Sequence, residues 1–249
     1  MKLLKPILLV NLLFLVAAAS VSAQSYDLPP LPSPEQYGNI LINRLSEKNK
    51  MKPVTFSHWI HRTKYTCRVC HLELEFTFKL NSSEITEKAN QEGRFCGACH
   101  NGKTAFGHTK DNCAKCHSGD ISFSKDKFKS LSAFPKATFG NKVNWVAALN
   151  KGLIRPKDSL QGNYKQMPFD KKLDLITSQN GMPPVLFSHK SHAQWLDCSN
   201  CHPDMFNVKK HTTKHFSMAR MIKGEFCGAC HLKTAFPLND CAACHPNMH

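Results

Sequence analysis

The chain has 249 residues, 12 of them cysteine, and a formal net charge of +15 at pH 7. This length suits one large domain or two small ones. A basic balance can indicate nucleic-acid binding, but the export signal described next argues against a nucleic-acid partner, and no later stretch reaches the roughly 20 apolar residues that a membrane span needs. We therefore expect an exported protein without a membrane span.

The first residues have the pattern of a secretory signal. Two lysines precede an apolar run from Ile7 to Ala19, and Val21-Ser22-Ala23 offers small residues for cleavage. We predict a signal peptide over residues 1–23, with an uncleaved membrane anchor as the alternative. Its removal would leave a charge of +13, because the two lysines are its only charged residues. The periplasm is the favoured location, with an extracellular or outer-membrane-associated protein as alternatives.

Residues 24–50 are predicted to be a Pro-rich N-terminal extension. Four prolines between Leu28 and Glu35 indicate an extended, semi-rigid tether. The apolar residues Ile40, Leu41 and Leu45 then suggest a short helix within residues 37–46.

Every cysteine belongs to a pattern of two cysteines separated by two residues, with a histidine directly after the second. This is the attachment signature of c-type haem, in which the two thiols bond to the porphyrin and the histidine binds the iron. Zinc would need the pairs grouped into tetrahedral sites, and disulfides would leave the histidines unexplained. The sequence therefore predicts six covalently attached haem c groups. The motifs are Cys67–Cys70–His71, Cys96–Cys99–His100, Cys113–Cys116–His117, Cys198–Cys201–His202, Cys227–Cys230–His231 and Cys241–Cys244–His245.

The motifs belong to an internal repeat. An offset of 131 residues carries Phe56-Ser57-His58 to Phe187-Ser188-His189 and also relates the first two motifs of each copy, whereas the third motif of the second copy falls three residues early. We expect two triheme domains, at residues 51–120 and 182–249. Few residues separate successive motifs, so haem should supply much of the apolar core, with short helices around the attachment sites and long coil between them.

Residues 121–181 contain no cysteine and no histidine. Phenylalanines and Trp145 are spread through this segment, and residues 145–149 suggest a helical turn before Gly152. We interpret it as a connector that covers haem edges and fixes one unit against the other. The alternative is a passive linker.

The pattern Phe-x-His-x-x-His ahead of three attachment motifs resembles the triheme cytochrome c7 family, relatives of the tetraheme cytochromes c3. Both units carry it, at residues 56–61 and 187–192. The resemblance implies a multihaem cytochrome c fold, mostly coil with short α-helices packed around six haems in two c7-like triheme domains. It also implies low-potential haems with two histidine ligands each, which serve periplasmic and extracellular electron transfer to metals or other external acceptors.

The resemblance also implies distal ligands. His58 would face the haem at Cys67/Cys70 and His61 the haem at Cys96/Cys99, with His189 and His192 in the same roles in the second unit. The family's third distal histidine lies between the first and second motifs.

The second unit has His211 and His215 there, on one face if the segment is helical. The first unit departs from the pattern, because by the repeat offset its equivalent positions are Leu80 and Glu84. His108 is the only other histidine of that unit, and it is one candidate for the haem at Cys113/Cys116. A cross-unit ligand from His211 or His215 is another, and an open iron is the third.

Eight histidines outside the motifs compete for six distal places. Methionine also ligates haem, although hydrophobic packing is the commoner role of such residues. The remaining candidates are His249, Met218 and Met221.

These patterns favour an electron carrier rather than an enzyme. Every motif ends in histidine, and none ends in the lysine found at the catalytic haem of multihaem nitrite reductases. The alternatives are a redox enzyme with one open-coordinate haem and a filament-forming conductive cytochrome. The expected partners are redox proteins, such as a quinol-oxidising complex or other cytochromes, bound by weak electrostatic docking. The sequence does not identify the donor, the terminal acceptor or the haem potentials.

Overall fold

The structure is a computed structural model that describes residues 26–162, 164–177 and 182–248. The predicted signal peptide at residues 1–23 and His249 lie outside the described residues. Within the described ranges, no helix has the length and apolar character needed to cross a membrane. Most of the described chain is coil and turn, and the helices are short, as the sequence predicts.

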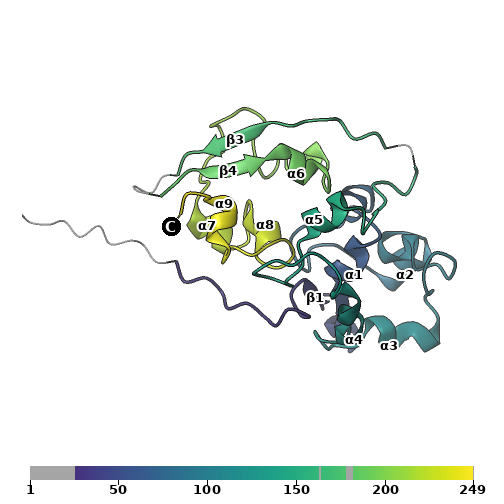
Figure 1. Cartoon of the computed structure of the whole chain (residues 1–249). Coiled ribbons are helices and arrows are strands. Elements are labelled where there is room, and N and C mark those ends of the chain that lie inside the picture. The colour runs from purple at the N-terminus through teal and green to yellow at the C-terminus, as the bar shows by residue number, and fades with distance from the viewer. Residues whose placement is uncertain (1–25, 163, 178–181, 249) are drawn as a thin grey trace, which may run out of the picture.

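The first half of the chain runs from a hairpin to the third attachment motif (Figure 1). Its elements are β1 (Asn39–Ile42), the 3-10 helix η1 (Glu47–Asn49), β2 (Val54–Ser57), α1 (His58–Arg62), the π-helix η2 (Val69–Glu73), α2 (Glu87–Gln91), the 3-10 helices η3 (Phe95–Ala98) and η4 (Lys110–Asn112), and α3 (Cys113–Cys116).

The second half begins with the connector and repeats the same plan. Its elements are α4 (Lys125–Phe128), the 3-10 helix η5 (Lys129–Leu131), α5 (Trp145–Asn150), β3 (Lys172–Leu175), β4 (Val185–Ser188), α6 (His189–Ala193), the 3-10 helix η6 (Cys198–Asn200), α7 (Met218–Ile222), α8 (Gly228–His231) and α9 (Cys241–Cys244). The helix predicted at residues 145–149 is confirmed by α5.

Each unit opens with a two-stranded antiparallel hairpin that leads directly into a histidine-bearing helix. β1 pairs with β2, with Asn39 opposite Ser57, and β3 pairs with β4, with Lys172 opposite Ser188. The helix predicted within residues 37–46 is therefore wrong, because residues 39–42 use their backbone groups to pair with β2. The strands β1 and β3 come from the segments predicted as the extension and the connector.

The main cluster of buried side chains lies between the units and is built largely by the connector. Trp59 of α1 and Trp195 after α6 pack into one cluster with connector residues, and Ala148 of α5 is fully buried there. Residues of the connector thus pack against residues of both units. The buried members of this cluster are Trp59, Leu131, Val143, Trp145, Ala148, Ile154 and Trp195.

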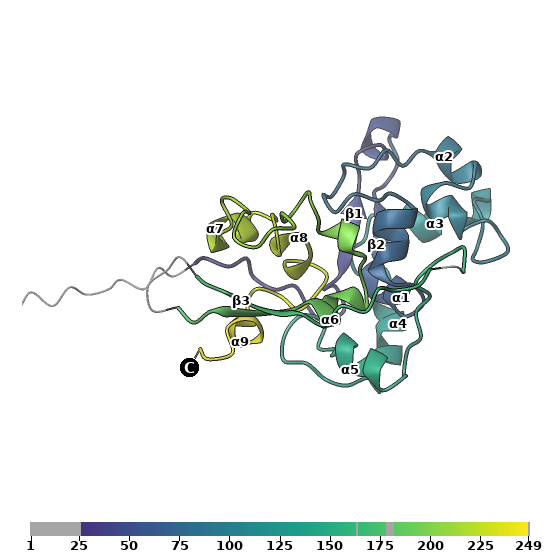
Figure 2. The ribbon, with the colours of Figure 1, turned by 90° about the horizontal axis from the view of Figure 1, so that it is seen from above.

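The two units also touch directly. The backbone N–H of Arg68 donates to the carbonyl of Trp195 at 3.0 Å, and the Asn200 side chain donates to the carbonyl of His71 at 3.2 Å. In both views α1 to α3 lie together on one side and α7 to α9 on the other (Figures 1 and 2). The first attachment motifs of the two units therefore meet at this junction.

Candidate cofactor sites

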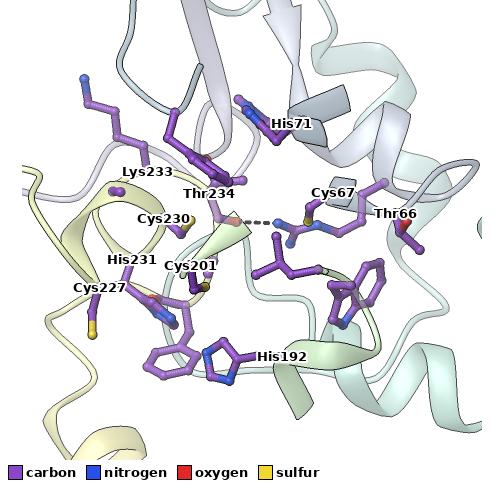
Figure 3. Close-up of a pocket in the computed structure, with 18 of the residues that line it drawn as sticks. Thr66, Cys67, His71, His192, Cys201, Cys227, Cys230, His231, Lys233 and Thr234 are labelled. Carbon is purple, nitrogen blue, oxygen red and sulfur yellow. Dashed lines mark hydrogen bonds between the residues drawn. The ribbon is translucent and has the colours of Figure 1, made fainter. Parts of the chain in front are cut away.

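A single cavity of about 2330 Å³ extends through both units. Pockets for single drug-sized ligands are usually about 300–1,000 Å³, so this space can hold several large groups. Every attachment cysteine except Cys113 lines it. Figure 3 shows part of it, where Cys67 and His71 of the first unit lie opposite Cys230 and His231 of the second.

The six motif histidines share one hydrogen-bond arrangement. Each ring donates from Nδ1 to a backbone carbonyl, which can only accept, so the protonated nitrogen is Nδ1 and the lone pair is on Nε2. Metal-binding histidines commonly use their second nitrogen in this way. The bonds are His71 to Phe76 at 2.8 Å, His100 to Phe106 at 3.0 Å, His117 to Lys52 at 2.8 Å, His202 to Phe206 at 2.6 Å, His231 to Phe236 at 2.8 Å and His245 to Pro183 at 2.7 Å.

The four histidines of the Phe-x-His-x-x-His segments follow the same rule. His58 donates from Nδ1 to Gly38 at 2.9 Å and His189 to Lys171 at 2.9 Å, in each case to the residue before the first strand of the hairpin. His61 and His192 donate instead to the carbonyl four residues earlier in their own chain, at 2.9 and 2.8 Å. All four rings therefore also carry their lone pair on Nε2.

The phenylalanine of this segment orients both rings. Phe56 stacks on His61 with ring centroids 4.4 Å apart and meets His58 edge-on at 4.9 Å. Phe187 makes the same two contacts in the second unit at the same distances. The aromatic position of the motif is thus a support for the two histidines that follow it.

Two pairs of rings face each other across the cavity. The ring centroids of His61 and His100 are 6.3 Å apart, and those of His192 and His231 are 6.2 Å apart. Metal–imidazole bonds are about 2 Å long, so two Nε2 atoms on one iron lie about 4 Å apart with the ring centres further out. These spacings leave room for one iron between each pair. The residues present therefore fit a haem with two histidine ligands.

Burial keeps the imidazole rings of two of these histidines uncharged. It lowers the pKa of His58 to about 3, with nearby His71 adding to the effect, and that of His231 to about 4. Both imidazoles are neutral at pH 7, as a metal ligand must be. These two rings thus present neutral lone pairs rather than positive charges to the cavity.

The pKa values of four cysteine thiols are raised, whereas that of a metal-binding thiol is lowered. Burial raises the pKa of Cys70, Cys96, Cys227 and Cys230 to about 12, whereas thiolate ligands need a depressed pKa. All twelve cysteines are free of disulfides, and no group of three or more side chains among the described residues is placed to hold a bare metal ion. Burial thus keeps these four thiols protonated at pH 7.

Close backbone packing explains the glycine in the second motif of each unit. A Cβ atom on Gly97 would overlap the carbonyl oxygen of Asn90 at the end of α2, and one on Gly228 would overlap that of Met221 in α7. Only glycine tolerates such an approach. The preceding helix is thereby pressed against the attachment site.

The third distal place is the region where the sequence interpretation needs correction. His211 and His215 are not on one helical face, because both residues adopt left-handed backbone angles, φ 62° and 59°, in turns. His211 lines the cavity and His215 does not. Met218 and Met221 also line it, from α7.

The equivalent positions in the first unit also differ from those expected. Matching hydrogen bonds, from the Thr77 N–H to Ser83 Oγ and from the Asn207 N–H to Thr213 Oγ1, set the local offset at 130 residues rather than 131. His211 is therefore matched by Asn81, which shares its left-handed backbone at φ 61°, and not by Leu80. By the same offset, Ile85 and not Glu84 matches His215.

Asn81 has a different use from a ligand. Its amide oxygen accepts from the Asn43 N–H at 3.0 Å, just after β1. It therefore fastens the loop to the hairpin.

The third motif of the first unit lies at the edge of the molecule. Cys113 is exposed, and neither it nor His117 lines the cavity. His108 is exposed too, close enough to His100 to lower the pKa of that ring further after burial has lowered it. The Thr109 carbonyl next to His108 accepts a 3.8 Å hydrogen bond from the Cys113 thiol. The structure thus brings His108 near this attachment site without showing a ring pair there.

The sequence also matches a known family in the same two regions. The family model for "Cytochrome c7 and related cytochrome c" matches residues 54–118 and 185–246, a little over half of the 249 residues. The chain belongs to the cytochrome c7 family. As a multihaem c-type cytochrome it carries haem c bound covalently at its six motifs, and members of the family are electron carriers.

Solved structures of multihaem cytochromes are similar in sequence. The C-terminal hexaheme fragment of GSU1996 is 28% identical over 88% of this chain and 99% of that chain, with a TM-score of 0.29. The dodecaheme cytochrome c GSU1996 is 28% identical over 85% of this chain and 75% of that chain, with a TM-score of 0.30. None of the curated proteins matches the chain.

Proposed function

We propose that this cytochrome is an exported electron carrier in a respiratory chain, with both axial positions of each of its haems filled by histidine. The observation that carries the proposal is the shared state of ten histidines, each held through Nδ1 with Nε2 free. Haem iron supplies one-electron redox chemistry when it is bound. An iron with two protein ligands has no free position for a substrate. The role of the protein is then to hold the haems, to shield them from water and to set their reduction potentials.

The proposed ligands are assigned by position and ring placement. His61 and His192 face His100 and His231, and His58 and His189 are proposed for the haems held by His71 and His202. His211 is proposed for the haem held by His245, since of the two candidates only His211 lines the cavity. His108 is proposed as the distal ligand of the haem held by His117.

The experiment is a mass and spectral measurement on the mature protein. Six covalent haems should add their mass to the polypeptide beginning near residue 24, and the reduced protein should show low-spin spectra. Carbon monoxide should bind no haem. An intact mass equal to that of the bare chain, or tightly bound zinc, would remove the proposal.

A second candidate function rests on the exposed third motif of the first unit. Cys113 is exposed, and the loop that could have carried its distal histidine carries Asn81 instead. If neither His108 nor a histidine of the second unit binds this iron, the haem would be open to small ligands, and a redox enzyme at this site is the alternative function. Stoichiometric binding of one carbon monoxide per protein would support this alternative.

A further inference from the structure

Arg62 is a half-buried cation at the boundary between the two units. It is the last residue of α1, and its Nη2 donates to the carbonyl of Thr234 in the second unit at 3.0 Å. Its guanidinium also lies over the rings of Trp145, at 5.1 Å, and Trp195, at 5.7 Å. One side chain of the first unit is therefore held by the connector and by the second unit.

The charge of Arg62 has no protein counter-ion. Among the described residues it forms no ion pair with a carboxylate. A guanidinium has five N–H donors, and the one protein acceptor found for it is a neutral carbonyl. Charges inside proteins are costly unless they are compensated. A group that enters the cavity is therefore exposed to an unneutralised positive charge.

The position of Arg62 relates it to two attachment sites, one in each unit. The guanidinium is close enough to interact electrostatically with the thiols of Cys67 and Cys230. Figure 3 shows these two labelled cysteines on either side of the dashed hydrogen bond that ends on Thr234. Arg62 also lines the cavity itself.

Comparison of the two repeats shows that only the first unit has this arginine. Helix α6 has the same length as α1, and the residue that matches Arg62 in it is Ala193. The second unit therefore supplies no such charge from the equivalent position.

We propose that Arg62 tunes the two haems attached at Cys67/Cys70 and Cys227/Cys230, raising the reduction potential of both across the boundary between the units. This proposal rests on the proposed function. An oxidised iron carries one more positive charge than a reduced one, so a fixed cation nearby favours the reduced form. Two charges about 10 Å apart at an effective permittivity near 20 change an equilibrium constant by about tenfold.

The test separates charge from contact. Arg62→Gln removes the charge, Arg62→Lys keeps it while losing the planar fork, and Arg155→Gln removes an exposed cation that also lines the cavity. The potential of each haem is followed by redox titration with NMR of the shifted haem methyl signals. Covalent haem content is measured by mass.

In Arg62→Gln, two of the six haems should become harder to reduce by about tenfold, which is about 59 mV for one electron. Arg62→Lys should keep most of the potential, and Arg155→Gln should change none because water screens an exposed charge. Unchanged potentials in an Arg62→Gln protein with six low-spin haems would overturn the inference and leave the proposed function intact. An equal fall of the reduction potentials in Arg62→Lys would also overturn it, because the effect would then come from the contacts of the guanidinium and not from its charge.

If Arg62→Gln does not accumulate with six haems, the reciprocal variant decides. Ala193→Arg places the same cation at the matching position of α6, and it should raise the potential of haems in the second unit. No rise in a six-haem Ala193→Arg protein would overturn the inference.

Discussion

At ten histidines, a backbone carbonyl decides which ring nitrogen can bind iron. The carbonyl fixes the proton on Nδ1 and also fixes the plane of the ring, so little conformational freedom remains to be lost when a metal is bound. Such supporting contacts typically contribute 10–100-fold to metal affinity. Gly38 and Lys171 thus belong to the sites through their backbone carbonyls.

The first residue-level prediction concerns the distal histidines. His58→Ala and His189→Ala should each leave one haem of six high-spin while all thioether bonds persist, because each removes one axial ligand. Electron paramagnetic resonance and haem-stained gels measure the two properties. Lys190→Ala, an exposed change on α6, is the control and should stay fully low-spin. Low-spin spectra in both histidine variants would contradict the assignment.

A second prediction separates His211 from His215. Asparagine is the suitable replacement, since it tolerates the left-handed backbone of both residues and stands at the matching position 81 of the first unit. His211→Asn should produce one high-spin haem. His215→Asn should produce none, because His215 does not line the cavity. The reverse result in the visible spectrum would exchange the two roles.

At the scale of elements, α5 joins the units through one large side chain. Trp145 packs in the buried cluster and donates from Nε1 to Asn141 at 3.2 Å. Trp145→Ala should lower the free energy of unfolding by about 3–5 kcal/mol, the usual cost of truncating a large buried aromatic residue. Val146→Ala, on the exposed side of the same helix, should cost far less. Thermal unfolding followed by circular dichroism tests the pair, and equal midpoints would show that this cluster does not hold the units together.

The same scale shows what the sequence could and could not predict. Residues that perform covalent chemistry, such as Cys96 and His100, were identifiable because attachment to haem fixes their spacing. The sequence predicts a helix where strand β1 lies, because the short apolar run has no clear period and its partner β2 begins only at residue 54. The Asn81 match was missed for a similar reason. The first unit has one more residue between His71 and Phe76 than the second unit has between His202 and Phe206, and one residue fewer later, before Cys96. The overall offset of 131 residues therefore hides the local offset of 130.

Across the whole molecule, net charge governs encounters with partners. The chain after residue 23 has a charge of +13, and haem propionates, about 12 charges for six haems, offset much of it. Exposed lysines should still steer a negatively charged partner, as in transient redox complexes. The rate of reduction by such a partner should fall as ionic strength rises, and that by a small neutral reductant should not. A partner rate independent of salt would contradict electrostatic docking.

The buried cluster between the units has a consequence for how the protein is made. Trp59, Ala148 and Trp195 pack against other side chains, so we expect this junction to form early, whereas the cavity in the units is lined by residues that haem would cover. We expect the centre of the molecule to form first, while cysteines far from it, such as Cys241 and Cys244 of α9, stay accessible for haem attachment. Hydrogen exchange of a variant lacking Cys241 and Cys244 should therefore show fast exchange around α9 but unchanged slow exchange in α5. Haem attachment would then proceed outward from a junction between the units that has already folded.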